Sequence, residues 1–192
     1  MNLAPILSAT KPHNLEWRPT MPLTSPEAQK ILGPAFLTSL RAADLDASQR
    51  AVIDEGWIRD DGAILLAAYR DSYFGNRSAF TDIGDYEWAA NGRGVPDLGL
   101  ETQGPERVHT LMRRGCAFAW AALHAVRASM PESQVMARIS AAPVLMDPDT
   151  FTGYVGFVTC RSDDATGPSS TDGQSGIQIV LWSHECAKPL PD

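Results

Sequence analysis

The stretch from Gly104 to Met130 constrains the fold more than any other part of the sequence, because it predicts one long amphipathic helix. Pro105 suits a first helical turn, where its missing N–H would have no intrahelical partner, and Pro131 ends the helix by restricting the residue before it. At 3.6 residues per turn, apolar side chains gather on one side, as is typical of a helix that covers a core. These residues are Val108, Met112, Gly115, Ala119, Ala122 and Val126, with Leu111, Leu123 and Met130 beside them.

A second stripe on the same predicted helix is chemically mixed. It consists of His109, Arg113, Cys116, Trp120, His124 and Arg127. Steps of three and four residues place these side chains one above the next. Two interpretations stay open: a site for a partner, or a half-buried helix face whose arginine heads reach water. We take His109, Arg113, Trp120 and Arg127 as candidate partner-binding residues.

The distribution of charge separates this helix from the rest of the chain. The net charge is −7, which argues against general nucleic-acid binding. Residues 44–103 carry twelve acidic and five basic side chains, whereas residues 104–138 carry two acidic and five basic ones. The basic helix could bind an acidic partner or pair with the protein's own carboxylates, and we favour the second.

The first 24 residues predict an extended arm. Pro5, Pro12, Pro19 and Pro22 exclude a helix and favour extended chain. The apolar residues between them need a surface, either their own domain or a neighbouring chain. From this arm we select Leu3, Ile6, Leu7 and Trp17 as candidate partner-binding residues.

The remainder, residues 25–192, is predicted to be a single α+β domain. Ser25 and Asp46 are N-cap residues of two short helices, the second with Gln49 in a capping box. Residues 63–74 suggest another helix, and residues 79–103 a long ordered loop. After the long helix the pattern becomes β. The predicted strands are Val135–Ala141, Gly153–Cys160 and Ile177–His184, and residues 161–175 form a loop. The expected fold is therefore the arm, short helices, and one long helix packed on a C-terminal three-stranded antiparallel sheet.

The positions of Cys160 and Cys186 allow a prediction about a disulfide, if the last two predicted strands form a hairpin. If the last two strands form a hairpin, Cys160 and Cys186 lie at opposite ends of it. Eight or so residues at about 3.3 Å each would separate them by more than about 20 Å. A disulfide needs Cα atoms within about 7 Å, so we predict no bond between these cysteines.

Catalytic and metal-binding patterns are weak. Cys116 could pair with His109 or His124, but a reactive cysteine is typically presented near a helix start, and this one is in the middle. The histidines lack the H-x-x-x-H spacing of a zinc site. The segment from Asp44 to Glu55 has the outer spacing of a calcium loop but has Gln49 where the sharp turn requires glycine. We select no catalytic or metal-binding residue and expect no cofactor.

These patterns favour a non-enzymatic protein–protein interaction protein. The sequence has no secretion signal, and its apolar runs are far too short to span a membrane, so we expect cytoplasmic synthesis and no membrane partner. The preferred function is a subunit of a larger assembly, of the virion or secretion-particle kind, that docks through its arm on proteins that include copies of itself. One alternative is an acidic immunity or inhibitor protein that binds a basic toxin. The other is a small Cys–His enzyme.

Overall fold

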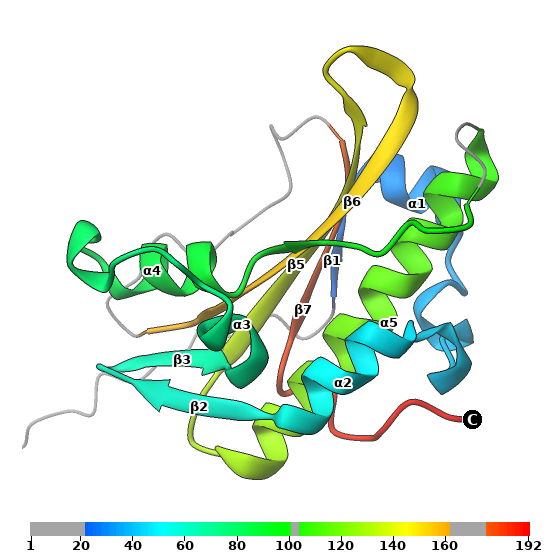
Figure 1. Ribbon diagram of the computed structural model, residues 1–192. Coiled ribbons are helices and arrows are strands. Elements are labelled where there is room, and N and C mark those ends of the chain that lie inside the picture. Colours follow the sequence, from blue (N-terminus) through cyan, green and yellow to red (C-terminus); the bar gives the residue numbers. More distant parts are fainter. Residues whose placement is uncertain (1–21, 101–103, 162–175) are drawn as a thin grey trace, which may run out of the picture.

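The computed structural model describes residues 22–100, 104–161 and 176–192. Its centre is the helix α5 (Pro105–Ser129), packed against an antiparallel sheet, so the α+β class is confirmed (Figure 1). The predicted core stripe of α5 is buried: Val108, Met112, Ala119, Ala122 and Val126 are at most 4% exposed. Gly115 permits a close approach to the sheet, because a Cβ atom there would lie 2.8 Å from the Ile139 Cγ2 methyl group.

The sheet has five strands in the order β1-β7-β5-β6-β4, with each neighbouring pair antiparallel. Their bounds are β1 Leu23–Thr24, β4 Arg93–Gly94, β5 Val135–Val144, β6 Asp147–Thr159 and β7 Ile177–Trp182. The three predicted strands are its central members, and two-residue edge strands extend it on both sides. The hairpin considered for the last two strands does not form, because β5 lies between β6 and β7.

Short helices and turns surround this centre. The helices are α1 Pro26–Leu32, α2 Ala47–Glu55, α3 Ala67–Asp71 and α4 Ile83–Ala90, with 3₁₀ turns at Leu37–Ser39, Ala42–Asp44 and Arg77–Ala79. Ser25 caps α1 and Asp46 caps α2 in a capping box with Gln49, as the sequence predicts. A second sheet pairs β2 (Trp57–Asp60) with β3 (Ala63–Leu66).

Two predictions for the middle of the chain are wrong. The predicted helix over residues 63–74 begins as strand β3 and is helical only in α3. The Asp61-Gly62 turn has φ values of 47° and 80° and reverses the chain into a β2–β3 hairpin. All four residues of β3 are buried, so its two faces do not alternate in polarity and the short apolar run resembled a helix. The predicted loop over residues 79–103 contains α4, which Asp82 caps.

The predicted arm is described only at its end. Leu23 and Thr24 are extended in β1 and pair with Val180 and Ile179 of β7. Leu3, Ile6, Leu7 and Trp17 lie outside the described residues, and so does most of the predicted loop, residues 162–175. Within the described part of the chain, no helix has both the length and the apolar character needed to cross a membrane.

Candidate functional site

The mixed stripe of α5 is largely covered by other parts of the chain. The His109 ring packs edge-on against Phe36, with ring centroids 5.4 Å apart. Trp120 Nε1 donates to the carbonyl of Lys188 at 2.8 Å, and His124 Nδ1 lies 3.0 Å from the carbonyl oxygen of Cys186. Segments from both ends of the sequence therefore pack on this side of the helix.

Arg113, a candidate partner-binding residue, is half-buried, because the turn after α1 folds over it. Its guanidinium donates to the carbonyl of Ser39 at 3.0 Å, and its Nε lies 3.2 Å from Asp44 Oδ1. Arg107 is paired in the same way with Asp97 at 2.6 Å. These two arginines support the interpretation that the basic helix pairs with the protein's own acids. Arg127 is the exposed member of the stripe. The partner-binding role of the stripe stays a prediction.

Arg113→Ala should lower the free energy of unfolding by about 1–2 kcal/mol, because it removes charge-assisted hydrogen bonds that hold the turn on the helix. Arg127→Ala, on the exposed turn of the same helix, should change it by less than about 0.5 kcal/mol. Thermal melts of the two variants give the comparison. Equal stability of the two variants would show that the Arg113 contacts contribute nothing.

The surroundings of Cys116 and Cys186 stabilise the protonated, neutral form of their thiols. Cys116 and Cys186 are fully buried, and burial raises the pKa of both thiols well above the usual range. A nucleophilic cysteine instead requires a lowered thiol pKa, which favours the reactive thiolate. The three cysteines all lie in described segments and form no disulfide. The geometric reason given for Cys160 and Cys186 is wrong, because β6 and β7 run parallel on either side of β5 and both cysteines follow the same ends of these strands. Among the described residues, no group of three or more His, Cys, Asp or Glu side chains is arranged to hold a metal ion.

A buried carboxylate, Glu87 on α4, joins the two sheets. It is 0% exposed, and its two oxygens accept from Ile64 N at 2.8 Å, Thr159 N at 2.8 Å and the guanidinium of Arg161 at 2.7 Å. Asn91, one turn further on, accepts from Leu66 N and donates to the Ile64 carbonyl. Both oxygens of Glu87 are fully occupied, so the group links β3 to β6 and is a structural element.

The β5–β6 hairpin extends beyond the rest of the sheet. Pairing of β5 with β7 ends at Ala141 and Ile177, whereas pairing with β6 continues to Val144 and Asp147. Figure 1 shows this hairpin projecting past the ends of the other strands. Leu145 and Met146 form its tip and are 98% and 91% exposed. Two adjacent, fully exposed large apolar side chains at the end of a projecting hairpin are typical of an interaction surface.

Asp147, the first residue of β6, holds the start of this strand directly behind the tip. Its carboxylate accepts from Thr150 Oγ1 at 2.7 Å and from Asp149 N at 3.1 Å. The hydrogen bond from the Thr150 hydroxyl is the main cause that lowers the pKa of Asp147, so this carboxyl is ionised at neutral pH. The tip is therefore held in a defined turn with negative charge directly behind it.

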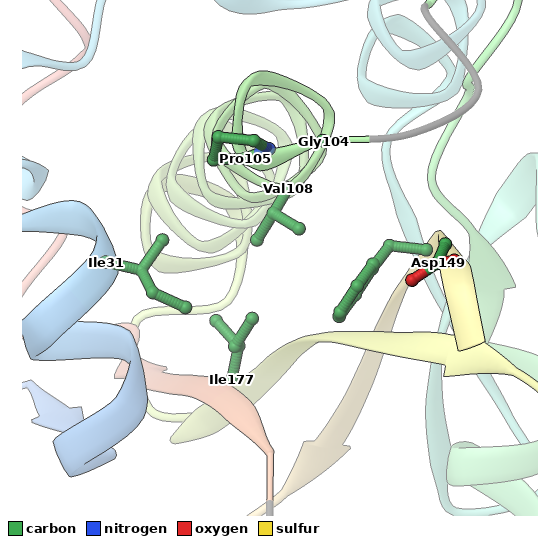
Figure 2. A pocket seen from close by; sticks show the side chains of 7 residues that line it. Ile31, Gly104, Pro105, Val108, Asp149 and Ile177 are labelled. Carbon is green, nitrogen blue, oxygen red and sulfur yellow. The ribbon is translucent and has the colours of Figure 1, made fainter.

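An apolar pocket of about 490 Å³ lies at the base of the hairpin. We call it the hairpin groove; Ile31, Pro105, Val108, Phe151 and Ile177 line it, with Asp149 at its rim. Figure 2 shows Ile31 from α1, Val108 from α5 and Ile177 from β7 converging on this space. Ile31 is 43% exposed. The groove and the tip therefore lie at the base and at the end of the same hairpin.

Sequence reasoning did not find the groove or the tip. The one local signal was Leu145-Met146 directly before Asp147-Pro148-Asp149, which places two apolar residues where a turn is normally polar. The groove has no local signal, because its lining comes from four separate elements. Comparison of the chain with family models, with curated proteins and with solved structures gave no match in any of the three.

Proposed function

We propose that the chain is a non-enzymatic protein–protein interaction protein and a subunit of a larger assembly, of the virion or secretion-particle kind. In this assembly the N-terminal arm of one copy docks in the hairpin groove of the next. The observation that carries the proposal is the apolar groove at the base of the hairpin together with the exposed Leu145–Met146 tip at its end. Monomeric proteins rarely leave such surfaces open to water, and they commonly mark sites of association.

The chemistry of the arm fits the groove. Residues 1–14 carry Leu3, Ile6 and Leu7, one lysine and no acidic side chain. The groove offers apolar walls with Asp149 at its rim, and Asp147 lies just behind the tip. An apolar segment with a single positive charge is complementary in both polarity and charge to such a surface.

An arm-to-groove contact is heterologous, since it joins two different surfaces of the same chain. Repetition of such a contact closes into a ring or propagates as a filament. This geometry suits a subunit of an assembly, and the exposed tip would cover the docked arm from the side.

The acidic inhibitor alternative draws less support from the side-chain contacts. Many acids of residues 44–103 are engaged within the chain: Asp46 and Asp82 cap helices, and Glu87 is buried. Asp44, Asp60 and Asp97 form ion pairs with arginines. These carboxylates are not available to cover a basic toxin surface, so the assembly function is preferred.

Leu145→Asp combined with Met146→Asp should weaken self-association without changing the fold. Placing two charges at the apolar tip should raise the dissociation constant by about tenfold or more, which corresponds to about 1.4 kcal/mol. Light scattering after size-exclusion chromatography, over a range of protein concentrations, measures the effect, and far-UV circular dichroism checks the fold.

The matched control is Phe74→Asp. This apolar side chain is 99% exposed and follows α3, which packs against α2 and β3 rather than against the hairpin. The control should associate as the unmodified chain does. An unmodified chain that stays monomeric at every concentration, or a control that loses association equally, would contradict the proposal.

A further inference from the structure

The face of the main sheet opposite α5 carries a second apolar cluster. Val158, Met136 and Trp182 lie side by side across β6, β5 and β7, and Val180 in the next row is paired with Leu23 of β1. Met136, Val180 and Trp182 are only 4%, 1% and 4% exposed. Together with the partly buried Leu23, Val158 and Cys160 they form one packed group, which we call the outer-sheet cluster.

The described residues cover only parts of the β5–β7 side of this face: His184 stacks on Trp182, and Trp88 of α4 lies over the guanidinium of Arg138. On this face α4 packs against β6, where Trp88 lies beside Tyr154 and Gly156. The helices that pack most closely on β7 are α5 and α1, and both lie on the opposite face, where Val108, Ile31 and Ile177 meet (Figure 2). Arg138 of β5 lies opposite Val180 of β7 on this face. Among the described residues, its Nε is buried and has no hydrogen-bond partner. A backbone carbonyl from a covering segment would supply the missing acceptor.

Composition identifies which segment can cover the cluster. Three stretches lie outside the described residues: 1–21, 101–103 and 162–175. The last two consist of Ser, Thr, Asp, Glu, Gly, Gln, Pro and Ala and contain no large apolar side chain. Only the first carries such residues, and Leu15, Trp17 and Met21 are the ones nearest to the described part of the chain.

The direction of β1 brings that segment to the cluster. Going backwards from Thr24 to Leu23, the chain advances along β7 from Ile179 to Val180, toward Trp182. Pro22 has no N–H and so ends strand pairing at the edge. Seven residues from Pro22 back to 15 span about 23 Å when extended, and four strands are about 15 Å across. Leu15 and Trp17 can therefore reach every member of the cluster.

We infer that residues 15–21 of the same chain cross the outer-sheet cluster, with Leu15 and Trp17 packed on Met136, Val180 and Trp182. The arm then has two parts. The proximal part covers its own sheet, while the distal part, with Leu3, Ile6 and Leu7, extends beyond it. Tethering favours the chain's own arm over that of a neighbour, because seven residues give a high effective concentration at the cluster. The inference does not depend on the proposed assembly.

Cys160 is the reporter for this contact. It is a half-buried member of the cluster, whereas Cys116 and Cys186 are fully buried elsewhere and report unfolding. The rate at which an aromatic disulfide reagent labels Cys160 in the native full chain measures the exposure of the cluster. Leu15→Asp combined with Trp17→Asp should accelerate this labelling by about tenfold or more, since it opens the cluster to the reagent. Cys116 and Cys186 should stay protected.

The matched control is Thr10→Asp combined with Asn14→Asp, which adds the same charge to the distal part of the arm. It should label at the rate of the unmodified chain. If Cys116 and Cys186 become reactive together with Cys160, the milder Trp17→Ala replaces the double variant. An unchanged Cys160 rate in the folded variant would overturn the inference. Protection that is lost on dilution of the unmodified chain would also overturn it, because the cover would then belong to a neighbour.

Discussion

Glu87→Ala should lower the free energy of unfolding by about 3–5 kcal/mol, among the largest losses we expect from a single substitution. The substitution leaves the backbone N–H groups of Ile64 and Thr159 without their acceptor and the guanidinium of Arg161 without its counter-charge. These groups join the β2–β3 sheet to β6. Loss of their contacts with Glu87 therefore removes a link between two parts of the core. At about 2–4 °C per kcal/mol for a chain of this size, the midpoint should fall by about 10 °C.

Glu55→Ala is the control for this prediction. Glu55 ends α2 and is exposed, so its removal should change the free energy of unfolding by less than about 0.5 kcal/mol. Thermal and urea unfolding of both variants give the values. Similar midpoints for the two variants would mean that the hydrogen bonds of Glu87 do not hold the sheets together.

Val126→Asp should abolish the folded domain. Val126 is 0% exposed in the interface between α5 and the sheet, and an unpaired carboxylate there costs several kcal/mol. Whole-domain stabilities are about 5–15 kcal/mol, so the cost, added to the lost packing, is comparable to the total. We expect no cooperative melting transition and loss of the near-UV circular dichroism signal.

Arg127→Asp places the same carboxylate on the next residue of the helix, where the side chain is exposed. This control should melt cooperatively, within a few degrees of the unmodified chain. A cooperative transition near the normal temperature for Val126→Asp would show that α5 does not cover the sheet with this face.

The sequence predicts those parts of the fold in which one local pattern decides the outcome. The long helix has two prolines as boundaries and a clear 3.6-residue period, and its buried stripe is confirmed residue by residue. The caps at Ser25 and Asp46 follow from the chemistry of their own side chains. The three long strands follow from β-branched and aromatic runs.

Tertiary context decides the features that were missed. Strand β3 is buried on both faces, so its apolar run has no period that distinguishes a strand from a helix. The burial of Arg113 depends on Ser39 and Asp44, more than 65 residues earlier in the chain, folding over α5. The hairpin groove needs four elements to meet. No single-residue pattern contains any of this information.

The most direct test of the assembly mechanism is to mix two variants that each lack one half of the contact. One carries Leu3→Asp, Ile6→Asp and Leu7→Asp in the arm; the other carries Ile31→Asp in the groove. The unmodified chain should form species larger than a dimer. Each variant alone should be a monomer, since its intact half has no complement.

Light scattering on the equimolar mixture gives the decisive mass. The intact arm of the groove variant should dock in the intact groove of the arm variant, and no further contact can form. We therefore expect a one-to-one dimer and nothing larger. A mixture that stays monomeric, although both variants are folded and the unmodified chain assembles, would contradict docking of the arm in the groove.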